Sequence, residues 1–192
     1  LKTVLPVRIT NVSPRTRDAA LFDCLLSRYH YLGYKGIVGQ NIKYLVRSSS
    51  DRPLACLLFG SAAWKTAPRD LFIGWDSRTR RQRINYITNN MRFLILPWVK
   101  VPHLASHILS RISRQLSADW MEKYGHPIYL LETFVDRSRF RGVCYRAANW
   151  ILTGQTKGRT RNDRDYTIKV PIKDVYVYPL SKNFREALCY GP

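Results

Sequence analysis

The sequence predicts an α/β or α+β fold in which helices flank one mixed β-sheet. Segments with strand-like patterns alternate with segments at helical spacing, and two early strands lie close enough along the chain to form a hairpin. Hydrophobic residues make up 45% of the 192 residues, a share typical of a globular protein with a core. Because there is no internal repeat and no low-complexity linker, we expect a single domain over residues 1–192.

The first part of the chain is expected to supply a strand, a helix and a hairpin. Residues 4–10 alternate as a strand does. A helix with one apolar face follows and runs to about Tyr31, and Gly33 is well placed as its C-cap. Residues 40–47 and 53–60 are separated by a Ser-rich turn, which is typical of a β-hairpin.

The middle of the chain is expected to hold short elements. Residues 61–68 suggest a helical turn, and residues 69–75 a strand or extended loop. The basic stretch 77–83 should be solvated and lead into a short helix near 84–90. Residues 92–99 are apolar enough for a buried strand.

The longest helix is expected at residues 104–123, where apolar residues recur at helical spacing. Pro102 opens it and Gly125 ends it. The remaining expected elements are a buried strand at 128–135, a short helix at 144–149, a strand at 150–153, a polar turn at 162–165, and one or two strands within 168–179.

The charge of the chain predicts a polyanionic partner. Lys and Arg number 32 against 13 acidic residues, which gives a net charge of +19. Self-repulsion on that scale destabilises a compact state, so nucleic acid is the expected partner, with DNA favoured over RNA. We expect no membrane association, because no apolar run is long enough to span a bilayer and no long basic amphipathic helix is present. A cytoplasmic location is expected, since the N-terminus lacks the layout of a signal peptide.

Two arginine-rich stretches are the expected phosphate contacts, although charge runs are usually just solvated surface. Aromatic residues offer stacking surfaces for bases, and His30, which lies between two tyrosines, either stacks on a base or packs. The candidate phosphate-binding residues are Arg78, Arg80, Arg81, Arg83, Arg137, Arg139, Arg141, Lys157, Arg159 and Arg161. The candidate stacking residues are Tyr34, Trp64, Trp75 and Trp98.

Two carboxylates lie at the end of a predicted strand. Glu132 and Asp136 are four residues apart, so their side chains should point to the same face of the sheet. They suit a general base with an orienting group, or ligands for a divalent metal such as Mg²⁺. The alternative is that Glu132 pairs with an arginine and Asp136 caps the following turn. Asp70 and Asp119 are most simply interpreted as arginine partners.

Two histidines begin the longest predicted helix. His103 and His107 are four residues apart and therefore share a helix face. That spacing suits a metal pair, but the sequence places no third ligand, and we expect no metal site there. His107 is kept as a candidate site residue. The four cysteines are too dispersed for a zinc ribbon or a disulfide framework.

Six motifs follow one another over about residues 5–180. They are Tyr29–Gly33, Arg69–Trp75, Asn90–Leu96, Leu131–Asp136, Tyr145–Trp150 and Gly154–Arg159. In this order they resemble the DruA family, which is named for the Druantia anti-phage defence system and whose related domains accompany transposases in mobile elements. The resemblance implies a phage-defence or mobile-element protein with a helicase or transposase as candidate partner, and one DruA-like domain.

The order of the expected elements is also similar to that of GNAT acyltransferases. In many of those enzymes a Tyr-x-x-x-Gly-Phe ending supplies a tyrosine that protonates the departing thiolate, and Tyr145 takes that place here. Two departures are evident. Asn149 stands where glycine is usual, and Val101–Ser106 replaces the glycine-containing turn that binds pyrophosphate.

Three functions follow from these patterns. The favoured enzyme is a GNAT-like transferase that modifies nucleic acid with an acyl donor, in which Glu132, Asp136 and Tyr145 converge in one cleft. The second is a nuclease that holds Mg²⁺ on Glu132, Asp136 and Asp70. The third is a non-catalytic DNA-binding module that recruits a partner enzyme.

Overall fold

The structure, a computed structural model, describes residues 1, 3–158 and 170–191. Its strands are β1 (Arg8–Asn11), β2 (Asn41–Arg47), β3 (Pro53–Ser61), β4 (Ile87–Ile95), β5 (Leu130–Asp136), β6 (Ile151–Gln155) and β7 (Lys173–Pro179). They follow the order β1-β2-β3-β4-β5-β7-β6. Strands β4 and β5 run parallel, whereas β1 and β2, β2 and β3, β5 and β7, and β6 and β7 run antiparallel. The prediction of a mixed sheet with flanking helices is confirmed. The chain forms two compact units: unit 1 comprises Leu1–Ser61 and Asn90–His126, and unit 2 comprises Ala62–Asn89 and Pro127–Pro192.

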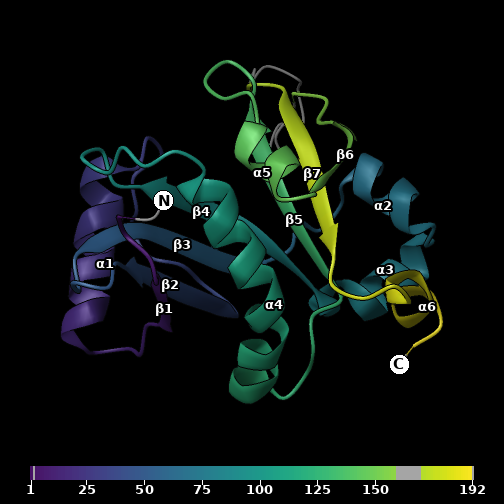
Figure 1. Ribbon diagram of the computed structural model, residues 1–192. Helices are drawn as coiled ribbons and strands as arrows, with labels where there is room; N and C mark the ends of the chain where they lie inside the picture. The colour runs from purple at the N-terminus through teal and green to yellow at the C-terminus, as the bar shows by residue number, and fades with distance from the viewer. Residues whose placement is uncertain (2, 159–169, 192) are drawn as a thin grey trace. The chain divides into compact units, whose positions relative to one another are not determined.

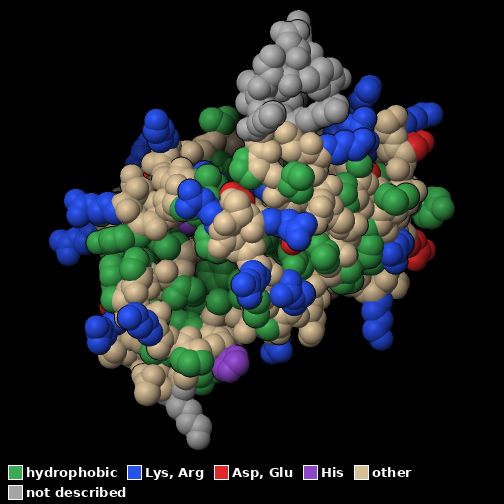
Figure 2. All heavy atoms as spheres, turned by 90° about the horizontal axis from the view of Figure 1, so that it is seen from above, with side chains coloured by type: hydrophobic (Ala, Val, Ile, Leu, Met, Phe, Trp, Pro, Cys, Tyr) green, Lys and Arg blue, Asp and Glu red, His purple; other side chains and the backbone are tan. Residues whose placement is uncertain are grey.

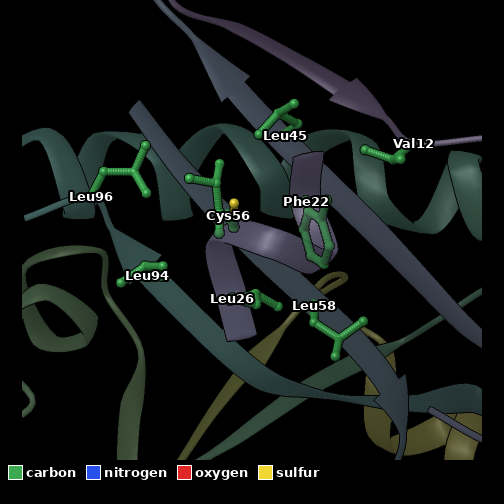
Figure 3. Close-up of a cluster of buried hydrophobic side chains, with 9 residues drawn as sticks. Val12, Phe22, Leu26, Leu45, Cys56, Leu58, Leu94 and Leu96 are labelled. Atoms are coloured by element: carbon green, nitrogen blue, oxygen red, sulfur yellow. The ribbon is translucent and has the colours of Figure 1, made fainter. Parts of the chain in front are cut away.

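Unit 1 contains helices α1 and α4, strands β1, β2 and β3, and the greater part of strand β4 (Figure 1). Its elements are β1 (Arg8–Asn11), α1 (Arg17–Tyr29), β2 (Asn41–Arg47), β3 (Pro53–Ser61), the greater part of β4 (Ile87–Ile95), and α4 (Leu104–Tyr124). Helix α1 begins where the Thr16 hydroxyl accepts a hydrogen bond from the Ala19 N–H at 3.2 Å. Its apolar face packs on the strands, and Figure 3 shows the side chains that meet there. They are Phe22, Leu25 and Leu26 from α1 with Val12, Leu45, Cys56, Leu58, Leu94 and Leu96.

Helix α4 covers the opposite face of β2 from α1. Leu45 packs with α1, so the neighbouring Tyr44 points the other way, and its hydroxyl donates to Asp119 of α4 at 2.6 Å. Asp119 also accepts from Gln115. The expected arginine partner of Asp119 is therefore replaced by a tyrosine and a glutamine. Burial on both faces explains the nearly continuous apolar sequence of β3.

Unit 2 is built around the first residues of β4 with β5, β7 and β6. On one face of these strands, Ile73 of α2 and Phe184 and Leu188 of α6 pack against Leu130 and Val177. Besides the start of β4, the elements of unit 2 are α2 (Ala67–Ile73), α3 (Ser77–Arg83), a 3-10 turn (Ile84–Tyr86), β5 (Leu130–Asp136), α5 (Val143–Ala147), β6 (Ile151–Gln155), β7 (Lys173–Pro179) and α6 (Phe184–Cys189).

The hairpin and the long helix agree with the sequence prediction. Helix α4 begins at Leu104, two residues after Pro102. Its C-cap is Gly125, which adopts φ +74° and donates its N–H to Met121 O at 2.9 Å. A left-handed residue at that position favours glycine, because a side chain there would be strained. This explains why the end of α4 was predictable to within a residue.

The prediction for residues 61–75 was wrong. Ser61 ends β3, and residues 67–73 form helix α2 instead of a strand. Pro68 lies in the first turn of α2 and Gly74 ends it with φ +89°. Both are standard helix boundary signals, which the strand-like pattern between them obscured.

Four further elements differ from the expectation. Residues 77–83 are helical, because the Asp76 side chain caps α3 by accepting from the Thr79 N–H at 2.7 Å. The helix expected near 84–90 is only a 3-10 turn, and β4 begins at Ile87 and ends at Ile95. The C-cap of α1 is His30, and Gly33 instead closes the next turn. The polar turn expected at 162–165 lies outside the described residues.

Within the described ranges, no helix combines the length and the apolar character needed to cross a lipid bilayer.

Candidate functional site

Glu132 forms a buried ion pair with Arg69 of α2. Its carboxylate accepts hydrogen bonds from Nη1 of Arg69 at 2.7 Å and from the Ala63 N–H at 2.6 Å. Both charged side chains are 0% exposed. Burial raises the pKa of the Glu132 carboxyl, and the Arg69 charge and the Ala63 N–H oppose that shift. Both oxygens of Glu132 are thus already engaged, as in the alternative interpretation in which it pairs with an arginine.

Asp70 completes this buried network. Its Oδ1 accepts from Nε of Arg69 at 2.9 Å, from Nη2 of the same side chain at 2.7 Å, and from the Trp75 indole at 3.0 Å. Its Oδ2 accepts from Arg80 at 3.3 Å. The side chain of Arg80 is only 12% exposed. Because Arg80 and Trp75 are engaged with Asp70 inside unit 2, we no longer expect them to contact nucleic acid.

Asp136 caps the turn that follows β5. Its Oδ1 accepts from the Ser138 N–H at 3.0 Å and from the Ser138 hydroxyl at 2.7 Å, while its backbone carbonyl accepts from the Phe140 N–H at 2.8 Å. The hydrogen bonds from Ser138 lower the pKa of the Asp136 carboxyl. The Asp136 carboxylate therefore stabilises the arginine-rich turn that follows it.

Tyr145 lies on the other face of β5. Its ring stacks on Tyr176 with centroids 5.9 Å apart and meets Trp150 edge-on at 5.1 Å. Its hydroxyl is 3.5 Å from Oγ1 of Thr133. Because adjacent residues of a strand point to opposite faces, Thr133 and Tyr145 are separated by the sheet from Glu132. The expected convergence of the two carboxylates with Tyr145 is not present in unit 2.

The segment after α5 keeps the backbone that a glycine would give it. Asn149 adopts φ +62°, and the Trp150 N–H donates to the Tyr145 carbonyl at 3.0 Å. Asparagine tolerates the left-handed region better than other non-glycine residues. The replacement of glycine by Asn149 is therefore a change of residue without an evident change of local conformation.

His107 borders a hollow along α4 in unit 1. The hollow measures about 470 Å³, and Nε2 of His107 is buried there with no hydrogen-bond partner among the described residues. Burial lowers the pKa of His107, and the charges of Arg111 and Arg114 lower it further. His103 forms the N-cap of α4 with φ +63°. In the described part of the chain, no cluster of three or more His, Cys, Asp or Glu residues could hold a metal ion.

Most of the other predicted phosphate contacts are solvent-exposed. Arg78, Arg81, Arg137, Arg139, Arg141 and Lys157 are exposed, whereas Arg83 is half-buried and stands over the Tyr86 ring at 5.9 Å. Arg137 lies 3.6 Å from Asp174, in an ion pair that water screens. Figure 2 shows many Lys and Arg side chains and few acidic ones on the face that it presents. Arg159 and Arg161 lie outside the described residues.

Two of the four predicted stacking residues are exposed, and the other two pack within the fold. Trp98 is 53% exposed and Trp64 is 44% exposed. Tyr34 packs edge-on against Phe22 at 6.4 Å and carries Lys43 over its ring, so it belongs to the interior of unit 1.

A family model described as Druantia protein DruA matches residues 1–167, which include all six motifs quoted from the sequence. The chain belongs to the DruA family. No curated protein matches it.

Solved structures similar to this DruA-family chain include spermidine N-acetyltransferases from Vibrio cholerae. One, in complex with CoA and spermine, has a TM-score of 0.57 at 9% identity over 92% of this chain and 96% of that one. Another, spermidine/spermine N-acetyltransferase SpeG in complex with manganese ions, has a TM-score of 0.56 at 9% identity over 94% and 96%. At such low identity the likeness concerns the fold, and it confirms the GNAT-like organisation that the order of elements predicted.

Sequence reasoning missed two residues that organise unit 2 of this DruA-family chain. Arg69 holds both Glu132 and Asp70, and Tyr176 of β7 stacks on Tyr145. Arg69 carried a usable signal, since an arginine beside apolar residues and next to an aspartate needs a carboxylate partner when it is buried. Tyr176 carried none, because its contact depends on the pairing of β5 with β7.

Proposed function

We propose that this DruA-family chain binds nucleic acid, DNA in preference to RNA, in a Druantia phage-defence or mobile-element system. The observation that carries the proposal is the turn after β5. Residues 137–146 hold four arginines and no acidic residue, and all four arginines are exposed. Four cations within ten residues repel one another. Binding to a phosphate backbone relieves that repulsion and is driven by the release of counterions from the nucleic acid.

The turn after β5 is held firmly enough to present these charges. Asp136 caps its start, and Arg146 donates to the Arg141 carbonyl at 2.6 Å and to the Tyr176 hydroxyl at 3.0 Å near its end. Helix α3 supplies further exposed cations at Arg78 and Arg81. Contacts of this kind read phosphates and not base sequence, so we expect broad sequence tolerance.

The direct experiment measures binding of the purified chain to labelled DNA and RNA duplexes of one sequence at low ionic strength. We expect both to bind, and the DNA duplex more tightly. A chain that binds neither duplex at low salt contradicts the proposal, because its electrostatic basis is strongest under that condition.

A second candidate is an acyl-type transferase activity on the GNAT-like fold. It is favoured by the left-handed Asn149, which keeps the turn after Tyr145, and by the Tyr145 hydroxyl, which lies beside Thr133 and can hand over a proton. The similar spermidine N-acetyltransferase was solved with CoA and spermine. The turn before α4 lacks glycine, but His103 adopts the left-handed backbone that glycine favours, and the helix N–H groups can hold phosphate.

Calorimetry with CoA and mass analysis of DNA nucleosides from expressing cells test the transferase. We expect CoA binding and a mass shift that Tyr145→Phe abolishes, since this change keeps the ring contacts and removes only the hydroxyl. If Tyr145→Phe protects cells from phage as well as the wild type does, the chain acts instead as a non-catalytic module for a helicase or transposase. A nuclease is disfavoured, because Glu132, Asp136 and Asp70 already accept hydrogen bonds within unit 2.

A further inference from the structure

An exposed group of aromatic side chains lies at the end of α1 in unit 1. Tyr29 is 42% exposed, Tyr31 39% and Trp98 53%, and Leu32 beside them is 50% exposed. The Trp98 ring meets the Tyr29 ring edge-on at 5.2 Å, and the His30 and Tyr31 rings lie 4.8 Å apart. We call Tyr29, His30, Tyr31 and Trp98 the aromatic platform. Large aromatic side chains left together at a surface indicate a binding surface more often than chance exposure.

The backbone beneath the platform is fixed. The Gly33 N–H donates to the His30 carbonyl at 2.7 Å, and the Leu32 N–H donates to Nδ1 of His30 at 3.2 Å. Arg92 of β4 donates from Nε to the Gly33 carbonyl at 3.2 Å, which ties the turn to the sheet. Rings held this way lose little conformational entropy when they bind a ligand.

The His30 ring carries no charge at neutral pH. Burial lowers its pKa to about 4, and the neighbouring charge of Arg92 contributes to the shift. A neutral imidazole next to a tyrosine offers a flat π surface without the hydration of an imidazolium ion.

The two segments that form the platform carry positive charge. These segments, residues 28–38 and 91–103, contain Arg28, Lys35, Arg92 and Lys100 and no acidic residue. Arg28, Lys35 and Lys100 are solvent-exposed. Exposed aromatic rings on segments that also carry exposed cations match a ligand with flat rings and a negatively charged backbone.

We propose that the aromatic platform stacks on unpaired bases, so that unit 1 binds single-stranded nucleic acid. This inference rests on the proposed nucleic-acid binding and adds the strand state that it selects. In a duplex the faces of the bases are buried in the stack, and such rings cannot reach them. The arginine turn of unit 2 needs only phosphates, which both duplexes and single strands provide.

The test compares alanine variants of the platform on three labelled probes of one sequence: single-stranded DNA, single-stranded RNA and duplex DNA. Tyr29→Ala, Tyr31→Ala and Trp98→Ala should each weaken single-strand binding about 5- to 150-fold, since stacking contributes about 1–3 kcal/mol per base. Duplex affinity should change less than about twofold, within the range of an unrelated surface change. Trp98→Phe keeps an aromatic face and should restore most of the single-strand affinity.

Tyr190→Ala is the matched control, because Tyr190 is an 86% exposed tyrosine of unit 2, and it should leave every affinity unchanged. Two results overturn the inference: single-strand affinity that the alanine variants do not change, or an equal loss on single strands and duplex. Those results leave the proposed function intact. If the wild-type chain binds none of the three probes, the proposed function itself fails. The DNA and RNA arms show which single strand the platform selects.

Discussion

Two groups of arginines in unit 2 show how one residue type serves two purposes. Arg69 is fully buried and donates to two carboxylates, Glu132 and Asp70. Arg137, Arg139 and Arg141 are exposed, and Arg137 lies 3.6 Å from the Asp174 carboxylate. A buried guanidinium must be matched within the fold because its desolvation is costly, whereas an exposed one keeps its hydration and can exchange it for an external anion. Burial, and not residue type, separates stabilising arginines from candidate binding arginines.

The largest expected effect comes from breaking the buried pair. Arg69→Met leaves the Glu132 carboxylate buried without its cation and should lower the free energy of unfolding by about 3–5 kcal/mol. Glu132→Gln keeps the shape and an acceptor for the Ala63 N–H, so its cost should be smaller. Urea denaturation followed by circular dichroism measures both. Equal and small effects, under about 1 kcal/mol, would mean that the pair contributes little to the fold.

The next largest effect is on DNA affinity and not on the free energy of unfolding. Replacing Arg137, Arg139 and Arg141 together by glutamine should weaken duplex DNA binding about 10- to 100-fold, because three phosphate contacts are lost. The free energy of unfolding should change by less than about 1 kcal/mol, since exposed residues contribute little to it. Fluorescence anisotropy and urea denaturation on one preparation give both values. Lost stability with intact DNA binding would reverse the roles assigned to the two groups.

A third arginine environment, in unit 1, predicts a pH dependence. Arg92 is half-buried and donates to the carbonyls of Gly33 and Met91. Burial lowers the pKa of His30 from its ordinary 6.5 to about 4, and the charge of Arg92 contributes to the shift. Between these values the unfolded chain binds the proton and the folded chain does not, so stability falls as pH drops from about 6.5 to about 4. The contribution of His30 should be about 1–2 kcal/mol, reduced by its partial exposure.

His30→Asn removes the titrating group but keeps a polar side chain. The difference in unfolding free energy between pH 7 and pH 4.5 should therefore be smaller in the variant than in the wild type. An identical difference in the two proteins would show that His30 titrates as it does in water. Carboxylates are common to both proteins, so their contributions to this difference cancel.

The smallest expected effect separates two neighbours on α3. Arg80 pairs with Asp70 and is 12% exposed, whereas Arg81 is exposed. Arg80→Gln should cost about 1 kcal/mol of stability through one long charged hydrogen bond and leave DNA affinity unchanged. Arg81→Gln should do the opposite, with stability within about 0.5 kcal/mol and a severalfold loss of affinity. If the two variants behave alike, burial does not separate the two groups.

The sequence was informative wherever a local signal and the tertiary contacts agreed. Pro102, the apolar spacing of α4 and the left-handed Gly125 predicted one helix closely, and the resemblance to the DruA family followed from motifs alone. The carboxylates of β5 illustrate the limit. The sequence offered catalysis or pairing for Glu132, and only the packing of α2 on β5 brings Arg69 to it.

The site prediction failed mainly because the sheet determines which side chains lie on the same face. Glu132 and Tyr145 are 13 positions apart in sequence, and nothing local indicates that β5 separates them. Helix α2 was mistaken for a strand because Leu71, which is 84% exposed, continues an apolar run that looks buried. Pro68 and Gly74 carried the correct signal for that helix.

The most direct test of the central claim is the salt dependence of duplex DNA binding by the wild-type chain. If the exposed arginines of unit 2 contact phosphates, the logarithm of the binding constant should fall linearly with the logarithm of salt concentration. Contacts from Arg78, Arg81, Arg137, Arg139 and Arg141 give an expected slope of about −4 to −5. A slope near zero, or no association at low ionic strength, would contradict the account.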